Sequence, residues 1–252
     1  TLAERWKFAS FVIVSLLIAT IIYPLYANWT WGGGFLAALG SNFGLGHGHV
    51  DFAGSSVVHM TGGVIALVAA KIVGPRIGKF DAEGNPRAIP GHNLPMVVLG
   101  TFILVFGWFG FNAGSTLAGT DSRIAVVAVN TMLASAAGAF ASYLHTRFRF
   151  GVPDLSMMCN GMLAGLVAIT APCAFVGAST AILIGGIAGV LVVEATLFVE
   201  RKLRLDDPVG AISVHGVNGT FGILCVGLFS DGRYGDGLNG VAGGVRGLFY
   251  GD

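Results

Sequence analysis

The stretch "DFAGSSVVHMTGG", residues 51–63, opens a long apolar segment, and its pattern returns as "DPVGAISVHGVNG" at residues 207–219. Each stretch begins with an Asp, carries a His eight residues later and has a Gly four residues after the His. An ionisable group inside an apolar helix is costly, and it is a functional candidate by default. The chain carries this costly pair twice, which predicts two related halves.

The composition is that of a membrane protein whose partner is the lipid bilayer. Hydrophobic residues make up 54% of the chain and charged residues 11%, against roughly 25% charged in a soluble domain. The net charge of +1 predicts no nucleic-acid partner. We find no nucleophile–base pair, metal cage or cofactor loop, so we expect neither an enzyme nor a metal or cofactor site. The cysteines are expected to be small buried residues: Cys159, Cys173 and Cys225.

Seven segments are apolar over about the 20 residues that a helix needs to cross a bilayer. None alternates with the period of a barrel strand, so the chain is predicted to be an all-α, polytopic transmembrane helical bundle. The predicted spans are 8–27, 52–74, 94–117, 123–145, 155–172, 178–200 and 208–230.

The positive charges predict how these spans are oriented. If the spans alternate in direction, 11 of the 14 basic residues fall on one side, which we assign to the cytoplasm. The other side then holds the glycine-rich loop "WTWGGGFLAALGSNFGLGHGHVD" and three basic residues, Arg123, Arg233 and Arg246.

The two Asp–His motifs are five spans apart, and an odd number of spans inverts their orientation. This spacing predicts an inverted repeat of five helices, an architecture common in transporters. Residues 94–230 would form the second repeat and residues 1–75 the end of the first, so we expect three further helices upstream. We treat residues 1–252 as one domain, incomplete at both ends, and expect that these residues alone do not form a sealed pore.

The two Asp residues are expected to lie at helix starts. Asp207 is interpreted as a structural helix cap, because a carboxylate there accepts backbone N–H groups. Asp51 is expected to do more than cap a helix, since it lies beneath an aromatic external loop.

His59 and His215 could be ordinary hydrogen-bonded residues of a helix interface, but their matched positions favour a functional role. The pseudo-symmetry would bring them together, where they could share a proton between facing ring nitrogens.

At this point the chain resembles a known family, the ammonium transporters of the ammonium transporter, methylammonium permease and Rhesus superfamily. The resemblance is carried by residues 51–63 and by "ALVAAKIVGPR" close behind them. It also rests on "HNLPMVVLGTFILVFGWFGFNAGS" (92–115) and "LDDPVGAISVHGVNG" (205–219). The residues of these motifs are more similar to the ammonium transporter branch than to the Rhesus branch. Eleven helices in the family's common form imply that seven are present here and that one is missing downstream.

The resemblance also implies roles for individual residues. Trp31 resembles the external tryptophan that stacks over the cation, and Ser115 the hydroxyl acceptor beside it. Phe111 resembles one of two stacked rings that gate the pore. Asp51 resembles the acidic residue that helps to hold the site. His59 and His215 resemble the twin pore histidines.

The resemblance implies transport of ammonium or ammonia through the plasma membrane. Ammonium would bind at the external vestibule, lose a proton and pass as ammonia through an apolar pore. A homotrimer with one pore per subunit is implied, with control by a cytosolic regulator of the PII type. Two alternatives stay open. One is an ammonium sensor that signals through a fused cytoplasmic domain, and the other is a Rhesus-like neutral gas channel.

Three other features have plainer interpretations. His47 and His49 have metal-ligand spacing, but a polar loop is favoured, since no further ligands are nearby. Glu194, inside the sixth span, is interpreted as a structural contact, and His145 as a solvated residue at the membrane border. The glycines of "GMLAG" (161–165) and "GGIAG" (185–189) are expected to let helices pack closely.

Overall fold

Long apolar helices form the whole architecture, because only a helix satisfies every backbone group within one lipid-embedded segment. The computed structural model describes residues 1–251, and within that range the only β structure is two isolated bridges. The α-helices are α1 (Phe8–Leu17), α2 (Tyr23–Trp31), α3 (Leu39–Phe43), α4 (Thr61–Val73), α5 (Leu94–Asn112), α6 (Arg123–Phe150), α7 (Leu155–Ile169), α8 (Ala178–Arg201) and α9 (Asn218–Phe229). Three π-helical segments adjoin these helices: η1 (Ile18–Ile22) joins α1 to α2, η2 (Ser55–Met60) leads into α4, and η4 (Ile212–Val217) leads into α9. The 3₁₀ turn η3 (Ala113–Thr116) follows α5. Two further 3₁₀ turns, η5 (Leu238–Gly240) and η6 (Leu248–Tyr250), lie near the C-terminus.

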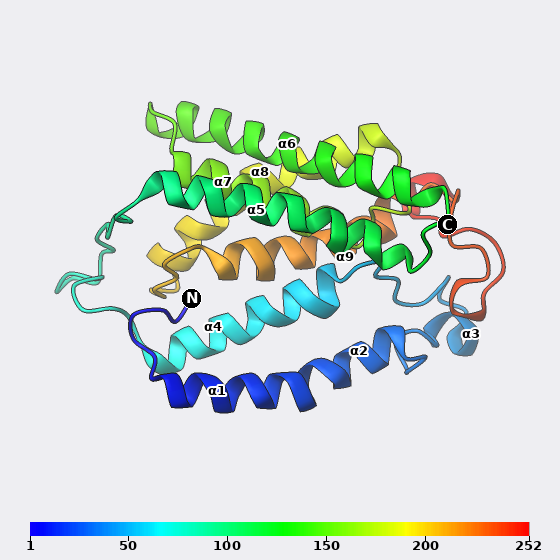
Figure 1. Cartoon of the computed structure of the whole chain (residues 1–252), viewed down its shortest axis with the longest axis horizontal. Helices are drawn as coiled ribbons and strands as arrows, with labels where there is room; N and C mark the ends of the chain where they lie inside the picture. The colour runs from blue at the N-terminus through cyan, green and yellow to red at the C-terminus, as the bar shows by residue number, and fades with distance from the viewer. Residues whose placement is uncertain (252) are drawn as a thin grey trace.

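Six continuous helices are long and apolar enough to cross a membrane, which confirms a polytopic bundle. They are Phe8–Trp31, Ser55–Val73, Leu94–Thr116, Arg123–Phe150, Ala178–Arg201 and Ile212–Phe229. Figure 1 shows these helices running along the long axis of the molecule. The N-terminus and the connection from α4 to α5 lie at one end, and α3 and the C-terminus lie at the other.

The predicted span 155–172 is shorter than expected, since α7 has 15 residues. Pro172 disfavours helix at the residue before it and has no N–H to continue the ladder. The chain then makes a buried turn in place of further helix. Asn130 of α6 holds this turn by donating to the carbonyls of Cys173 at 2.9 Å and Val176 at 2.8 Å.

Both glycine motifs lie at close helix contacts, as predicted. Ala134 and Gly138 of α6 face two glycines of each motif: Gly161 and Gly165 of "GMLAG" on α7, and Gly185 and Gly189 of "GGIAG" on α8. A Cβ at any of these four glycines would collide with α6. The three helices therefore approach closely, and Figure 1 shows them side by side. All three cysteines are free and buried, as predicted.

The inverted repeat is visible in how its two motifs begin. Asp51 Oδ2 accepts a hydrogen bond from the N–H of Ser56 at 2.8 Å, and Asp207 Oδ2 accepts one from the N–H of Ile212 at 2.6 Å. Both bonds reach five residues along the chain. Each carboxylate therefore caps the helix that follows it.

The helices begin later than the hydropathy predicts. Gly54 and Gly210, each three residues after its Asp, have φ of 119° and 71°, a left-handed backbone that interrupts any helix from the Asp onward. Helix therefore begins at Ser55 and Ile212, later than the predicted starts at residues 52 and 208. His59 and His215 lie in the first residues of their helices, within the π-helical segments η2 and η4. Such segments are frequent at functional sites.

The Gly that follows each His lets the two motifs cross. A Cβ on Gly63 would collide with the backbone of Gly216, and one on Gly219 would lie 2.8 Å from the backbone N of Met60. Each contact joins the Gly of one motif to the residue just after the His of the other. The crossing therefore follows the same pseudo-symmetry as the caps, and it brings the two histidines into one place.

Candidate functional site

Three of the residues expected to bind the substrate line one cavity of about 250 Å³ at the end of the bundle that carries α3. They are Trp31, Asp51 and Ser115. The fourth, Phe111, does not line this cavity and instead contacts His59. We call this cavity the vestibule.

The Asp51 carboxylate organises the floor of the vestibule. Its Oδ1 accepts from the N–H groups of Gly54 and Ser55 at 2.8 and 2.9 Å. Its Oδ2 accepts from the N–H groups of Ser56 and Val57 at 2.8 and 3.0 Å, and from the Ser56 hydroxyl at 2.7 Å. A carboxylate has about four lone-pair sites, so these donors use all of them. Asp51 therefore offers the vestibule a fixed negative charge, with no oxygen left over for a ligand.

Trp31 and Ser115 each donate their polar hydrogen to a backbone carbonyl, which leaves the Trp31 ring face and the Ser115 oxygen available. The indole N–H of Trp31 donates to the carbonyl of Asp51 at 2.7 Å, which fixes the ring while 44% of the residue stays exposed. The Ser115 hydroxyl donates to the carbonyl of Phe111 at 2.7 Å. With its hydrogen used, the Ser115 oxygen can only accept. An indole face beside an acceptor is suited to a small cation that donates hydrogen bonds.

The structure brings His59 and His215 together. Their Nδ1 atoms lie 3.2 Å apart and their rings are stacked, with centroids 5.2 Å apart. One ring must donate and the other accept, so neutral histidines share one proton here. The Nε2 atom of His59 is buried and has no hydrogen-bond partner among residues 1–251. The Nε2 atoms on the outer side of the pair therefore remain available to donate or accept a hydrogen bond.

Trp108 also belongs to this site, although it was not among the predicted residues. His59 stacks on Trp108 and on Phe111, with ring centroids 5.3 Å away in both cases. The indole N–H of Trp108 donates to the Thr170 hydroxyl at 3.1 Å, which fixes the ring. The signal was present in "GWFGF", since residues three apart share a helix face.

Two hydroxyls of the vestibule were also missed. Thr30 and Thr116 line the cavity, and neither Oγ1 atom has a partner within residues 1–251, although both atoms are buried. A buried hydroxyl without a partner is costly. These two groups therefore make the vestibule favourable for a polar ligand. No sequence pattern marks them, because the cost depends on which way each hydroxyl faces.

His47 and His49 do not converge on a common point. His47 Nε2 lies 2.9 Å from the carbonyl of Gly243, whereas His49 Nε2 lies 2.9 Å from the hydroxyl of Ser56 and its ring lines the vestibule. No group of three metal-type ligands occurs within the described part of the chain.

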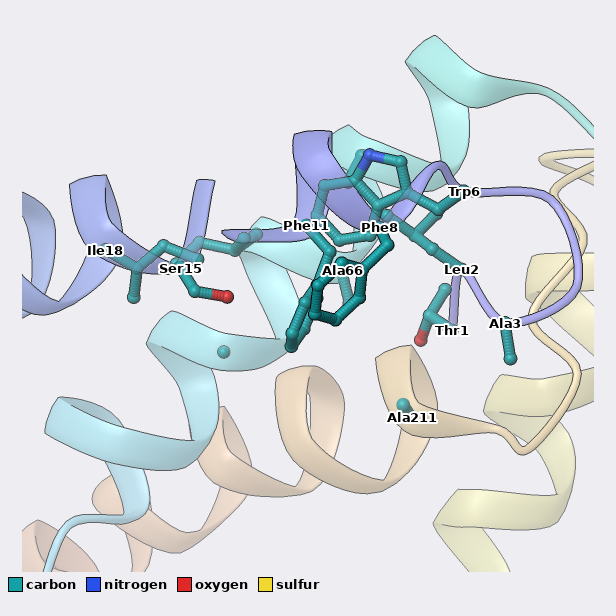
Figure 2. Close-up of a pocket in the computed structure, with 13 residues that line it drawn as sticks. Thr1, Leu2, Ala3, Trp6, Phe8, Phe11, Ser15, Ile18, Ala66 and Ala211 are labelled. Carbon is teal, nitrogen blue, oxygen red and sulfur yellow. The ribbon is translucent and has the colours of Figure 1, made fainter. Parts of the chain in front are cut away.

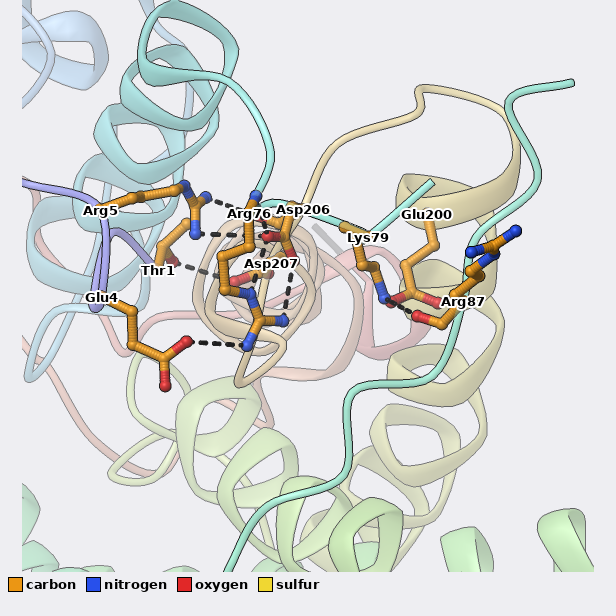
Figure 3. Close-up of polar contacts among 9 residues, drawn as sticks. All are labelled: Thr1, Glu4, Arg5, Arg76, Lys79, Arg87, Glu200, Asp206 and Asp207. Atoms are coloured by element: carbon orange, nitrogen blue, oxygen red, sulfur yellow. Dashed lines mark hydrogen bonds and ion pairs between the residues drawn. The ribbon is translucent and has the colours of Figure 1, made fainter. Parts of the chain in front are cut away.

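The opposite end of the bundle holds a cluster of ion pairs beside the Asp207 cap (Figure 3). Arg76 donates to Asp206 from its Nε at 2.9 Å and its Nη2 at 3.0 Å, and Arg5 Nη1 lies 3.4 Å from the same carboxylate. Burial acts to raise the pKa of Asp206, but the hydrogen bonds and charge of Arg76 outweigh it and lower the pKa. For Asp207, burial prevails and raises the pKa, opposed by the N–H of Ile212.

This cluster ties the two motifs together outside the site. Arg76 follows α4, which continues from His59, and Asp206 adjoins the residue that caps the His215 helix. Lys79 pairs with Glu200 of α8 close by. We call the Arg5–Arg76–Asp206 contact the clasp.

A family profile described as the Ammonium Transporter Family matches residues 1–252. The chain belongs to this family. It is 53% identical over 239 residues to "Ammonium transporter Amt2" of Archaeoglobus fulgidus, a match that covers 93% of this chain and 50% of that protein. It is 38% identical to "Ammonium transporter 1 member 1" of Solanum lycopersicum, which covers all of this chain and 54% of that one. The chain thus spans about half the length of the curated relatives it matches.

Solved structures share the architecture. A structure titled "Sensor Amt Protein" superposes with a TM-score of 0.86 at 40% identity and covers 92% of this chain and 57% of its own. Candida albicans Mep2 superposes with a TM-score of 0.84 at 30% identity and covers 98% of this chain and 52% of its own.

A second cavity in this member of the ammonium transporter family is larger than the vestibule but is not suited to a cation. It measures about 570 Å³ and lies between the N-terminal segment, α1, α4 and Ala211. Figure 2 shows the rings of Trp6, Phe8 and Phe11 over it. Its lining holds no Asp, Glu, Lys, Arg or His. An unpaired charge in such surroundings is strongly disfavoured, so the smaller vestibule is the better candidate.

The predicted structural contact of Glu194 is present in this family member. Its Oε1 lies 2.7 Å from His145 Nε2 and 2.9 Å from Arg149 Nε. The interpretation of His145 as a merely solvated residue is therefore wrong, because it bridges α6 to the Glu194 carboxylate on α8.

Proposed function

We propose that the protein containing this chain transports ammonium or ammonia across the plasma membrane as a multi-pass protein. The observation that carries the proposal is the His59–His215 contact, which lies beyond the vestibule and beside Phe111. Membership of the ammonium transporter family supports it. So do relatives whose names describe ammonium transporters.

Recruitment would take place in the vestibule. Ammonium donates N–H bonds to the Ser115 oxygen and lies against the Trp31 ring, while Asp51 supplies a compensating charge. Potassium has a similar size but can neither donate these bonds nor shed its charge. Beyond the vestibule Phe111 and Trp108 make the path apolar, and a permanent cation there loses hydration without replacement.

Ammonium passes this region by separating into ammonia and a proton, which travel apart. The His pair carries the proton in a balanced step. A proton binds the free Nε2 lone pair of one ring, the shared proton moves from its Nδ1 to the other Nδ1, and the second ring releases the proton on its own Nε2. Both rings end neutral. Ammonia crosses the same apolar stretch as a neutral molecule.

The assembly is proposed on the family resemblance. We propose a homotrimer with one pore in each subunit, regulated by a cytosolic protein of the PII type. No further partner is needed for the chemistry described above.

A second function is favoured by one observation. The solved structure titled "Sensor Amt Protein" is 40% identical to this chain and superposes with a TM-score of 0.86. The same vestibule could bind ammonium in order to signal through a fused cytoplasmic domain. A neutral gas channel would use the same pore without moving charge.

One assay separates these three functions. The full-length protein is reconstituted in proteoliposomes, and ammonium-evoked current and internal pH are recorded together, with potassium as the control ion. The transporter predicts current for ammonium and none for potassium. A pH response without current supports the gas channel. Ammonium binding with neither response supports the sensor and contradicts transport.

A further inference from the structure

His49 is an ionisable side chain of the vestibule that the proposed function does not use. It lies on the loop before η2 and lines the same cavity as Trp31 and Ser115. The N–H of His49 donates to the carbonyl of Leu36 at 3.0 Å, which fixes the backbone at this position. Its ring packs edge-on against Tyr26 of α2, with ring centroids 6.3 Å apart.

The tautomer of His49 follows from a chain of two hydrogen bonds. The Ser56 hydroxyl lies 2.7 Å from Asp51 Oδ2. The ionised carboxylate can only accept, so the hydroxyl hydrogen points to it. The Ser56 oxygen must then accept from His49 Nε2, 2.9 Å away, so Nε2 carries the hydrogen. The neutral ring is left with a lone pair on Nδ1, which makes no hydrogen bond within residues 1–251.

The groups around His49 keep this ring neutral at neutral pH. Burial lowers the pKa of His49, and the charge of Asp51 opposes that shift without reversing it. The other titratable groups that face it are phenols, Tyr26 from α2 and Tyr234 across the cavity. Both are uncharged at neutral pH. Asp51 is thus the one charged side chain facing the ring from the described part of the chain.

We infer that His49 is a specificity-determining residue of the vestibule, which accepts an N–H bond from ammonium when neutral and repels the cation when protonated. This inference rests on the proposed function. Protonation replaces the Nδ1 acceptor by a donor and adds a positive charge to a cavity of about 250 Å³. Both changes disfavour a cation that donates hydrogen bonds. Thr30 and Thr116, with their unpaired hydroxyls, complete a polar shell to which this acceptor adds.

The test compares variants that differ only in whether residue 49 can titrate. His49→Gln places an amide N–H near the position of Nε2, so it can keep the bond to Ser56, but it gains no charge in acid. His47→Gln is the matched control, two residues away on the same loop and bonded to Gly243. Ammonium currents in proteoliposomes give KM at an external pH of about 7.5 and about 5, with internal pH fixed. Ammonium stays protonated throughout this range.

For the wild type and His47→Gln, we expect KM to rise about five- to tenfold in acid, the effect of one charge several ångströms from the cation. For His49→Gln, KM should change less than twofold. His49→Asn serves as a second non-titrating variant if the first does not reach the membrane. A merely structural role for His49 would change expression or stability and leave the pH profile in place.

Two results overturn the inference alone: a wild-type KM that is flat with pH, or an acid dependence that His49→Gln and His49→Asn both retain. A wild type that neither binds nor moves ammonium at either pH overturns the proposed function as well. The two failures are therefore distinguishable.

Discussion

The hydrogen bonds that Ser115 and Asp51 make within the protein determine what each side chain can offer a ligand in the vestibule. Ser115 is an acceptor because its hydrogen is given to Phe111, and Asp51 is a fixed charge because its lone pairs are occupied by backbone donors. The family resemblance assigned both residues to the site. The structure adds that the Ser115 oxygen remains free to accept a hydrogen bond, whereas Asp51 has no oxygen left for a ligand.

The free oxygen of Ser115 is tested by removing it. Ser115→Ala should raise KM for ammonium at least about tenfold, because a hydrogen bond to a charged group contributes about 1.5–3 kcal/mol and about 1.4 kcal/mol corresponds to a factor of ten. The measurement is the concentration dependence of ammonium current. Ser41→Ala is the control, since the hydroxyl of Ser41 donates to Ala38 on the exposed surface. Equal KM values for the two variants would exclude Ser115 from cation binding.

Asp51 should matter for folding as much as for charge. Asp51→Asn replaces one carboxylate oxygen by a donor and leaves two buried N–H groups without an acceptor, so we expect a loss of about 2–4 kcal/mol in stability. Thermal unfolding in detergent measures it. Asp236→Asn is the control, because Asp236 accepts a single N–H, that of Gly243, on an exposed loop. If both variants melt alike, the capping account of Asp51 is wrong.

At the scale of elements, the two His helices are one motif used twice in opposite orientations. An Asp cap, a left-handed Gly, a π-helical turn that carries the His, and a second Gly at the crossing occur in the same order in both. The second Gly explains the last position of the repeated pattern, because the other backbone passes there. The distance between the histidines is thus set by a glycine contact.

The crossing predicts a sharp difference between two adjacent glycines. Gly63→Ala places a methyl group against the Gly216 backbone, whereas nothing lies within 4 Å of a Cβ at Gly62. Gly63→Ala should destabilise the protein by about 1–3 kcal/mol, the usual cost of overpacking, and reduce ammonium current by separating the rings. Gly62→Ala should be neutral or slightly stabilising, since Ala favours helix. Similar melting temperatures for the two variants would contradict the crossing.

The sequence predicted elements better than it predicted their ends. Hydropathy located the spans, and the spacing of Asp51 and Asp207 located the inverted repeat. Hydropathy could not place the helix starts, because residues 52–54 are as compatible with helix as with the left-handed turn that Gly54 makes. The π-helical turns depend on the crossing itself, a contact between distant segments. The sequence correctly predicted a loop at His49, but it could not predict the bond to Ser56, which forms only once that loop folds over η2.

At the scale of the whole molecule, one end of the bundle carries the vestibule and the other carries the ion pairs of the clasp. The vestibule lies beside α3 and the clasp lies at the opposite end, where the N-terminal segment meets the start of the His215 helix. The clasp connects both His helices without touching either ring. We expect it to hold their relative position through electrostatics that depend on pH.

The sign of that dependence follows from Asp206. Its pKa is lowered in the folded state, so its contribution to stability is complete above its ordinary pKa of about 3.9 and is lost as pH falls below that value. Arg76→Gln should lower the melting temperature at neutral pH, and the difference from wild type should shrink on acidification to about pH 3. Arg87→Gln is the control, because Arg87 is exposed and its side chain makes no ion pair in the described part of the chain. A difference that is constant with pH would contradict the clasp.

The central claim is that His59 and His215 act as one unit in selective transport, and ammonium current across a set of histidine variants tests it most directly. His59→Ala, His215→Ala and the double variant are compared with wild type in proteoliposomes, with potassium as the second ion. Because the pair shares one proton, we predict that each single variant loses about as much ammonium current as the double variant, and that wild type conducts no potassium. Losses that multiply in the double variant, or single variants with wild-type ammonium current, would contradict the account.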